Sequence, residues 1–178
     1  MSGTVWTIGH STRELAGFLA VLRAHDIAVL ADVRRFPGSK RYPHFASDAL
    51  AQRLPEEGMR YLPMPALGGR RAPARDSRNT GWKNAAFRAY ADYTGTAEFA
   101  EGLRALTDAA ARAPLAFMCA EAVWWRCHRR IIADVLTARG WEVRHILDEK
   151  PAALHVLEPP GHLVDGELSY EPLGSLGL

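Results

Sequence analysis

The chain has 178 residues, 48% of them hydrophobic and 24% charged, and its formal net charge is +2. This length suits one α/β domain, which would bury roughly 70% of the surface that its unfolded chain exposes. The composition is that of an ordinary globular protein and argues against disorder. No stretch approaches the ~18 apolar residues of a membrane helix. The first nine residues also lack the basic start and apolar core of a signal peptide. We therefore expect a cytoplasmic protein with no membrane partner.

Five short apolar runs predict β-strands, because they are rich in β-branched residues or bounded by turn residues. They cover residues 5–8, 27–31, 59–64, 115–119 and 142–147. Apolar residues at helical spacing predict helices between them, at residues 15–22, 47–54, 85–94, 97–112 and 128–139. Ser11, with Glu14 three residues later, has the form of a capping box, and Ser47 is expected to cap the second helix.

The alternation of strands and helices predicts the fold class. Parallel strands joined by right-handed crossovers place helices on both faces of a sheet. We therefore expect a Rossmann-like, doubly wound α/β fold with a mainly parallel sheet of about five strands. Residues 1–150 would form this single domain, and residues 151–178 an acidic C-terminal extension with a hairpin around Asp165-Gly166.

Positive charge is concentrated in two predicted loops, residues 33–47 and 65–84. These loops hold nine of the 22 lysine and arginine residues against a single acid, Asp76. Aromatic residues interleave with the basic ones, namely Phe36, Tyr42, Phe45 and Trp82. Arginines on phosphates and rings stacked on bases are the usual means of holding a nucleic-acid strand. The loops therefore predict a phosphate-bearing ligand, either a nucleotide or a nucleic-acid end. The alternative is a non-catalytic nucleic-acid-binding module that uses the same loops.

Polar side chains follow the carboxyl ends of three predicted strands, where open α/β sheets bind ligands. The set consists of His10, Ser11, Arg13, Asp32, Arg34, Cys119 and Glu121. We expect one cleft to gather them, with Arg13, Arg34 and Arg129 binding an anion.

Both cysteines of the chain lie within nine residues, at Cys119 and Cys127. A cysteine between a strand and a helix, close to several arginines, has its thiolate favoured by positive charge and by the helix dipole. We expect Cys119 to be a thiolate nucleophile of a hydrolase or transferase, with Glu121 and His128 transferring protons. The spacing from Cys119 to Arg126 is one residue longer than the Cys-x5-Arg loop of cysteine phosphatases, which argues against that particular activity.

A metal centre is the other open alternative. Cys119, Cys127 and His128 could ligate zinc, with His10 or Asp32 completing the site. No Cys-x2-Cys knuckle anchors such a site, and neighbouring residues such as Cys127 and His128 seldom point the same way, so we expect no metal and no cofactor.

Several ordered motifs in residues 4–147 closely resemble the bacterial and archaeal family called domain of unknown function 488. They are Thr7-Ile8-Gly9-His10-Ser11-Thr12, Asp32-Val33-Arg34 with Pro37 and Ser39, Leu67-Gly68-Gly69, Asn79 with Trp82, Phe87 with Tyr90-Ala91, Cys119-Ala120-Glu121 and Cys127-His128-Arg129. The resemblance implies a compact Rossmann-like fold and a shared polar pocket whose reaction is not established. The family's motif positions fall on His10, Ser11, Arg13, Asp32, Arg34, Cys119, Glu121, Cys127, His128 and Arg129. Many relatives carry polar residues where this chain has Ala122-Val123-Trp124-Trp125.

Overall fold

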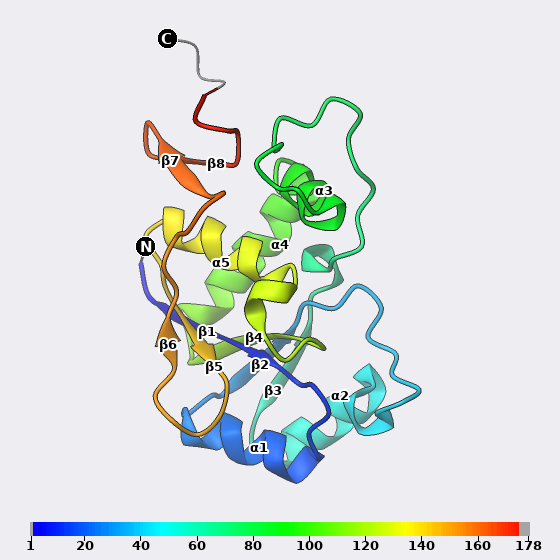
Figure 1. The fold of residues 1–178 in the computed structure, drawn as a ribbon. Helices are drawn as coiled ribbons and strands as arrows, with labels where there is room; N and C mark the ends of the chain where they lie inside the picture. The colour runs from blue at the N-terminus through cyan, green and yellow to red at the C-terminus, as the bar shows by residue number, and fades with distance from the viewer. Residues whose placement is uncertain (1, 175–178) are drawn as a thin grey trace.

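A computed structural model describes residues 2–174 and shows a six-stranded sheet in the order β3-β2-β4-β1-β5-β6 (Figure 1). The strands are β1 (Thr4–Gly9), β2 (Val29–Asp32), β3 (Arg60–Pro63), β4 (Leu115–Cys119), β5 (Glu142–Ile146) and β6 (Ala153–Leu154). The first five pair in parallel, and β6 adds an antiparallel edge. The predicted α/β class with a mainly parallel sheet is confirmed, and the sixth strand was not expected.

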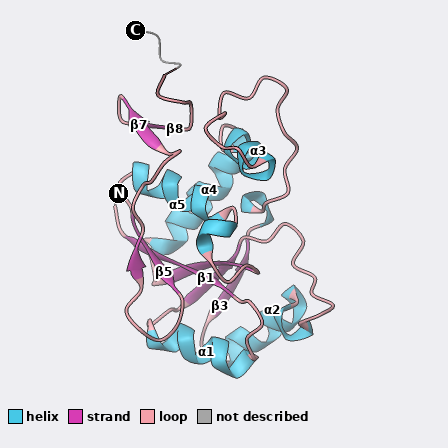
Figure 2. Ribbon diagram, in the orientation of Figure 1, coloured by secondary structure: helices cyan, strands magenta, loops and turns pink. Residues whose placement is uncertain are grey.

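Helices cover both faces of the sheet (Figure 2). The helices are α1 (Leu15–Ala24), α2 (Ser47–Glu56), α3 (Ala85–Tyr93), α4 (Ala97–Ala110) and α5 (Arg129–Ala138). The first two lie on one face and the other three on the opposite face. Three 3-10 turns complete the connections, η1 (Pro43–Phe45), η2 (Pro65–Leu67) and η3 (Trp124–Arg126). Within residues 2–174, no helix is long and apolar enough to cross a membrane.

The alternation of side chains along each strand divides the core into two halves. On β4, Phe117 and Cys119 belong to the cluster that packs under α3, α4 and α5, whereas Ala116 and Met118 belong to the cluster over α1 and α2. All four side chains are buried, as expected for a central strand of a parallel sheet. The thiol of Cys119 therefore lies on the same side of the sheet as α5.

Both predicted serine caps are wrong. Ser11 has a positive φ of 52° and precedes the true N-cap, Glu14, whose side chain makes no capping bond. The backbone N–H of Ser11 donates to the carbonyl of Ala120. The hydrogen bonding between the β1 and β4 segments therefore continues through Ser11, and the helix starts after it. Ser47 is already helical and follows the N-cap Ala46.

The connections after β1 and β4 give the sheet a topological switch point. These two strands are neighbours, but the chain leaves β1 through α1 to reach β2, and leaves β4 through α5 to reach β5 on the other side. Adjacent strands whose connections depart in opposite directions leave a crevice at their carboxyl ends. Gly9 and Cys119 end these strands in register with each other.

Residues 151–174 pack against the rest of the chain. After β6, a hairpin forms from β7 (His162–Val164) and β8 (Glu167–Ser169), and its turn consists of Asp165 and Gly166, both with positive φ. The hairpin brings Tyr170 into the core beside Trp82. The ion pair between Arg78 and Glu171 ties the acidic segment to the basic loop of residues 65–84.

Gly9 is required where β1 meets the loop after β4. A Cβ at this position would lie 1.8 Å from the carbonyl oxygen of Glu121, whereas one at Gly17, in the exposed part of α1, would meet nothing within 4 Å. We expect Gly9→Ala to lower the free energy of unfolding by about 3 kcal/mol through overpacking. Gly17→Ala should raise it by about 0.5–1 kcal/mol, because alanine favours the helix. Urea unfolding of both variants tests this, and equal effects would contradict the close approach at Gly9.

Candidate functional site

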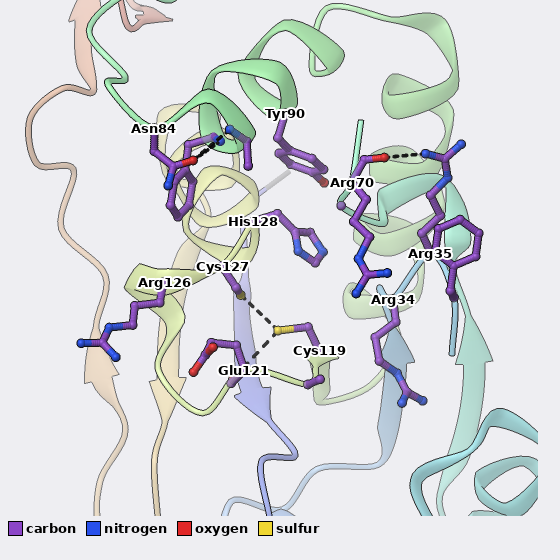
Figure 3. Close-up of a pocket in the computed structure, with 15 residues that line it drawn as sticks. Arg34, Arg35, Arg70, Asn84, Tyr90, Cys119, Glu121, Arg126, Cys127 and His128 are labelled. Atoms are coloured by element: carbon purple, nitrogen blue, oxygen red, sulfur yellow. Dashed lines mark hydrogen bonds between the residues drawn. The ribbon is translucent and has the colours of Figure 1, made fainter. Parts of the chain in front are cut away.

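A cavity of about 450 Å³ lies above the carboxyl ends of β2 and β4 (Figure 3). Of the residues expected in the cleft, five line it, namely Arg34, Cys119, Glu121, Cys127 and His128. Residues of the two predicted basic loops also line it, including Arg35, Phe36, Arg70 and Asn84. They come from the loop after β2, the turn after η2 and the N-cap of α3, and Tyr90 of α3 joins them. The cavity thus lies beside the switch point of the sheet.

The two cysteines meet at the floor of this cavity. Their Sγ atoms are 3.1 Å apart, and the side chain of Arg129 lies against both. Its Nε donates to Cys119 at 3.0 Å and to Cys127 at 3.3 Å, while its backbone N–H also donates to the Cys127 sulfur at 3.4 Å. The remaining guanidinium nitrogens donate to Thr7 Oγ1 at 2.8 Å and to the Glu121 carbonyl at 2.5 Å.

These contacts require a negative charge on the sulfur pair. Arg129 is only 1% exposed, and none of its hydrogen-bond partners within residues 2–174 is a carboxylate. A buried cation is costly unless an anion accompanies it. Among the hydrogen-bond partners of Arg129 within residues 2–174, only the two sulfurs can ionise, so the arrangement favours one thiolate and one thiol in the pair.

The surroundings of the two sulfurs favour ionisation of Cys127 over Cys119. Burial opposes ionisation of Cys127, but the thiol of Cys119, the positive charge of Arg129 and the backbone N–H of Arg129 lower the pKa of Cys127 to about 5. Burial and the hydrogen bond to Cys127 raise the pKa of Cys119 well above its ordinary value. The sequence-based hypothesis placed the thiolate on Cys119, which stays a prediction, and the pKa directions make Cys127 the other candidate.

His128 lies at the side of the cavity as a neutral imidazole. Burial lowers its pKa, and its Nε2 donates to the carbonyl oxygen of Val33 at 2.9 Å. The other nitrogen, Nδ1, faces Gly69, where an added Cβ would lie 3.0 Å away. His128 thus links the loop after β2 to the start of α5, and Nδ1 remains as an acceptor.

His10, Asp32 and Arg34 form a second polar cluster, on the α1 and α2 side of the sheet. Arg34 makes a bidentate ion pair with Asp32, with distances of 2.8 and 2.6 Å, and also donates to the Phe45 carbonyl. The ring of His10 stacks on Phe45 at 4.3 Å, and burial lowers the pKa of His10 to about 4. Most N–H groups of Arg34 are therefore already occupied, and its role in this arrangement is to fix the loop after β2.

Ser11 and Arg13 do not line the cavity. Arg13 donates to the carbonyl oxygens of Gly9 and Leu147, which joins the ends of β1 and β5. Glu121 does line the cavity, and its side chain is exposed.

The alternative of a metal centre is not supported by the described residues. Within residues 2–174, no three histidine, cysteine or carboxylate side chains are placed to hold a metal ion together. The ring of His128 is turned to Val33, and His10 and Asp32 lie across the sheet from the two sulfurs.

A buried hydrogen-bond chain starts at Arg129 and leads away from the cavity. Thr7 Oγ1 accepts from Arg129 and contacts His145 Nδ1 at 3.2 Å. His145 Nε2 lies 2.9 Å from His155 Nδ1, and His155 Nε2 lies 2.8 Å from Asp134 Oδ1. Because Arg129 can only donate and a carboxylate only accepts, one directed chain satisfies every link.

The chain ends on a tyrosine from the C-terminal segment. The hydroxyl of Tyr170 donates to Asp134 Oδ2 at 2.8 Å. Burial and the charges of His155 and Arg129 lower the pKa of His145 to about 2, which keeps this imidazole neutral. Trp124 covers it with a stacked ring at 4.1 Å and so helps to bury the chain.

Sequence reasoning missed this chain because its members are spread over β1, α5, β5 and the C-terminal segment. One signal was available, since Thr7 and His145 interrupt apolar strands on the same face and are partners in register.

Selective alkylation tests the assignment of the thiolate. At pH 6, iodoacetamide should modify Cys127 first, because its lowered pKa leaves it ionised while Cys119 remains a thiol. Peptide mapping at low extents of reaction identifies the residue, and the rate should decline only as the pH approaches about 5. In denaturant both cysteines should react alike, with the ordinary thiol pKa of about 8.5. Preferential labelling of Cys119 in the folded protein would overturn the assignment.

Tyr170→Phe tests the far end of the hydrogen-bond chain. The change leaves one oxygen of the buried Asp134 without its donor, so we expect the free energy of unfolding to fall by about 1–3 kcal/mol. Tyr42→Phe is the matched control, because the Tyr42 hydroxyl makes no hydrogen bond to the described residues. Equal stability of the two variants in thermal unfolding would rule out a structural role for this hydroxyl.

Comparison with known proteins supports the resemblance read from the motifs. No curated protein and no solved structure matches the chain significantly. Residues 14–136, which are more than half of the chain, match the family described as "Domain of unknown function DUF488". This match includes the cavity residues and Arg129, whereas Thr7, His145, His155 and Tyr170 lie outside it. The chain therefore belongs to the DUF488 family.

Proposed function

We propose that the cavity binds a phosphate-bearing ligand, a nucleotide or a nucleic-acid end, and that a cysteine thiolate acts on its phosphate. The observation that carries the proposal is the close pair of Cys119 and Cys127 sulfurs, in contact with Arg129, at the floor of a cavity whose rim is rich in arginine. A nucleophilic anion beneath free guanidinium groups suits an electrophile that is itself anionic.

Two cations at the rim have charges that nothing in the described structure neutralises. Arg70 and Arg126 line the cavity, both are exposed, and neither forms an ion pair within residues 2–174. The side chain of Arg70 extends into the cavity, toward the side of Cys119 (Figure 3). The third rim cation, Arg35, holds the carbonyl of Arg70 and thereby fixes that turn. These groups are placed to bind phosphate oxygens.

An exposed aromatic ring favours a ligand with a base. Phe36 lines the cavity and is 62% exposed, and the guanidinium of Arg35 lies over its ring at 5.3 Å. A large exposed ring beside arginines is a stacking platform for a nucleobase. The ligand in this proposal therefore places its phosphate near Arg70 and its base on Phe36.

The chemistry proposed is phosphoryl transfer through the thiolate. Sulfur attacks phosphorus, an S–P bond forms and the P–O bond to the leaving group breaks. The leaving oxygen takes a proton from the carboxyl group of Glu121. Water then gives a proton back to Glu121 and attacks phosphorus, which breaks the S–P bond and restores the thiolate. His128 keeps the loop after β2 in place during both steps.

Binding measurements with two probes test the proposal. Inorganic phosphate and adenosine 5′-monophosphate should both bind in calorimetric titrations, the nucleotide more tightly. Arg70→Ala should weaken both by about tenfold, because it removes a charge-assisted contact. Phe36→Ala should weaken only the nucleotide, by about tenfold, as expected for lost base stacking. Arg112→Ala and Leu163→Ala, exposed and away from the cavity, should change nothing.

Cysteine variants separate this proposal from a non-catalytic nucleic-acid-binding module. An enzyme should release phosphate from nucleotides or from 5′-phosphorylated oligonucleotides, and Cys127→Ser should abolish the release while ligands still bind. If Cys119→Ser abolishes activity and Cys127→Ser does not, Cys119 is the nucleophile. Tight binding of oligonucleotides without turnover would favour the module, for which the basic loops and Phe36 suffice. If neither probe binds, the proposed enzyme is overturned, and if oligonucleotides also fail to bind, the module is overturned as well.

A further inference from the structure

We propose that Cys119 and Cys127 also form a redox-active dithiol, which hydroperoxides oxidise to an intramolecular disulfide. This inference goes beyond the proposed function and needs no phosphate ligand. It rests on the distance between the sulfurs, their access to the cavity and the charge of Arg129.

The sulfurs are already close to bonding distance. They lie 3.1 Å apart, and a disulfide requires about 2 Å, so a shift of about 1 Å joins them. Cys119 is held in β4, whereas Cys127 lies in extended backbone between η3 and α5. The movement can thus come from the short connection that carries Cys127, and the sheet stays in place.

The two cysteines also differ in the way that such a reaction requires. One sulfur must be an accessible thiolate to attack the oxidant, and a second thiol must lie next to it to resolve the product. Both cysteines line the cavity, with Cys127 the more exposed, and Arg129 fixes one negative charge on the pair. The Cys119 sulfur lies 3.1 Å from the Cys127 sulfur, within reach for the resolving step.

The reaction proceeds in two balanced steps. The Cys127 thiolate attacks one oxygen of the hydroperoxide, so an S–O bond forms, the O–O bond breaks and the departing alkoxide takes a proton from water. Cys119 then attacks the sulfenic acid sulfur, an S–S bond forms, and the hydroxyl leaves as water with the Cys119 proton. The two cysteines lose two electrons, and the hydroperoxide becomes an alcohol and hydroxide, because the water that protonates the alkoxide leaves a hydroxide and the second step releases one water.

Arg129 makes the oxidation easy to reverse. Formation of the disulfide removes the thiolate, so the buried guanidinium keeps only neutral hydrogen-bond partners within residues 2–174. A dithiol whose reduced form is stabilised in this way yields an oxidising, readily reduced disulfide. An external thiol should therefore restore the pair.

Intact-protein mass spectrometry after titration with hydrogen peroxide tests the proposal. Wild-type protein should lose the mass of two hydrogen atoms and form no disulfide-linked dimer. Dithiothreitol should restore its original mass. Cys119→Ser lacks the resolving thiol, so dimedone should trap a sulfenic acid on Cys127. The wild-type chain in denaturant is the matched control, and its thiols should react about tenfold more slowly near pH 6.

Two results would overturn the proposal. One is direct addition of oxygen atoms to wild-type protein with no intramolecular disulfide. The other is the absence of dimedone labelling on Cys127 in the Cys119→Ser variant, together with a reaction with hydrogen peroxide no faster than in denaturant. Neither readout depends on phosphate binding, so failure here leaves the proposed function intact, and failure of phosphate binding leaves the dithiol intact.

Discussion

The buried guanidinium of Arg129 is the interaction on which the site depends. It contacts both cysteines, the first strand through Thr7 and the loop after β4 through the Glu121 carbonyl. A charge so deeply buried needs an anion, and the nearest carboxylate connected to it, Asp134, is reached only through three intervening side chains. The protein meets this requirement with a thiolate. Reactivity of the cysteine pair is thus a consequence of how the helix start is held against the sheet.

The backbone has to satisfy a matching constraint. For Arg129 to reach Thr7 and Glu121 together, the loop after β4 must lie directly on the end of β1, and only glycine at position 9 leaves the space. The switch point supplies the crevice, and Gly9 brings its two walls into hydrogen-bond contact. The backbone N–H groups of His10 and Ser11 then extend the pairing into the loop. Fold and charge placement therefore depend on the same few residues.

Much of this could be predicted from the sequence, because strand runs and helical spacing are local. The five parallel strands, the five helices and the gathering of Cys119, Glu121, Cys127 and His128 follow from such patterns. The face of the sheet on which each polar side chain lies was harder to predict. Asp32 and Arg34 share a strand end with Val33, but they point to the opposite face and bind each other. The role of His155 was also out of reach, because it depends on a short edge strand that carries little apolar signal.

Tyr170 gives the molecule a defined order of assembly. The hydrogen-bond chain joins Thr7 in the first strand of the sheet to Tyr170, which follows the β7-β8 hairpin. Chains fold from the amino end as they are made. The sheet around the cysteines can therefore form while Asp134 still lacks its tyrosine and His145 still lacks its histidine partner. The polar interior is completed only when the hairpin arrives, so a chain interrupted within its last segment would hold a thiolate site with an unfinished lining.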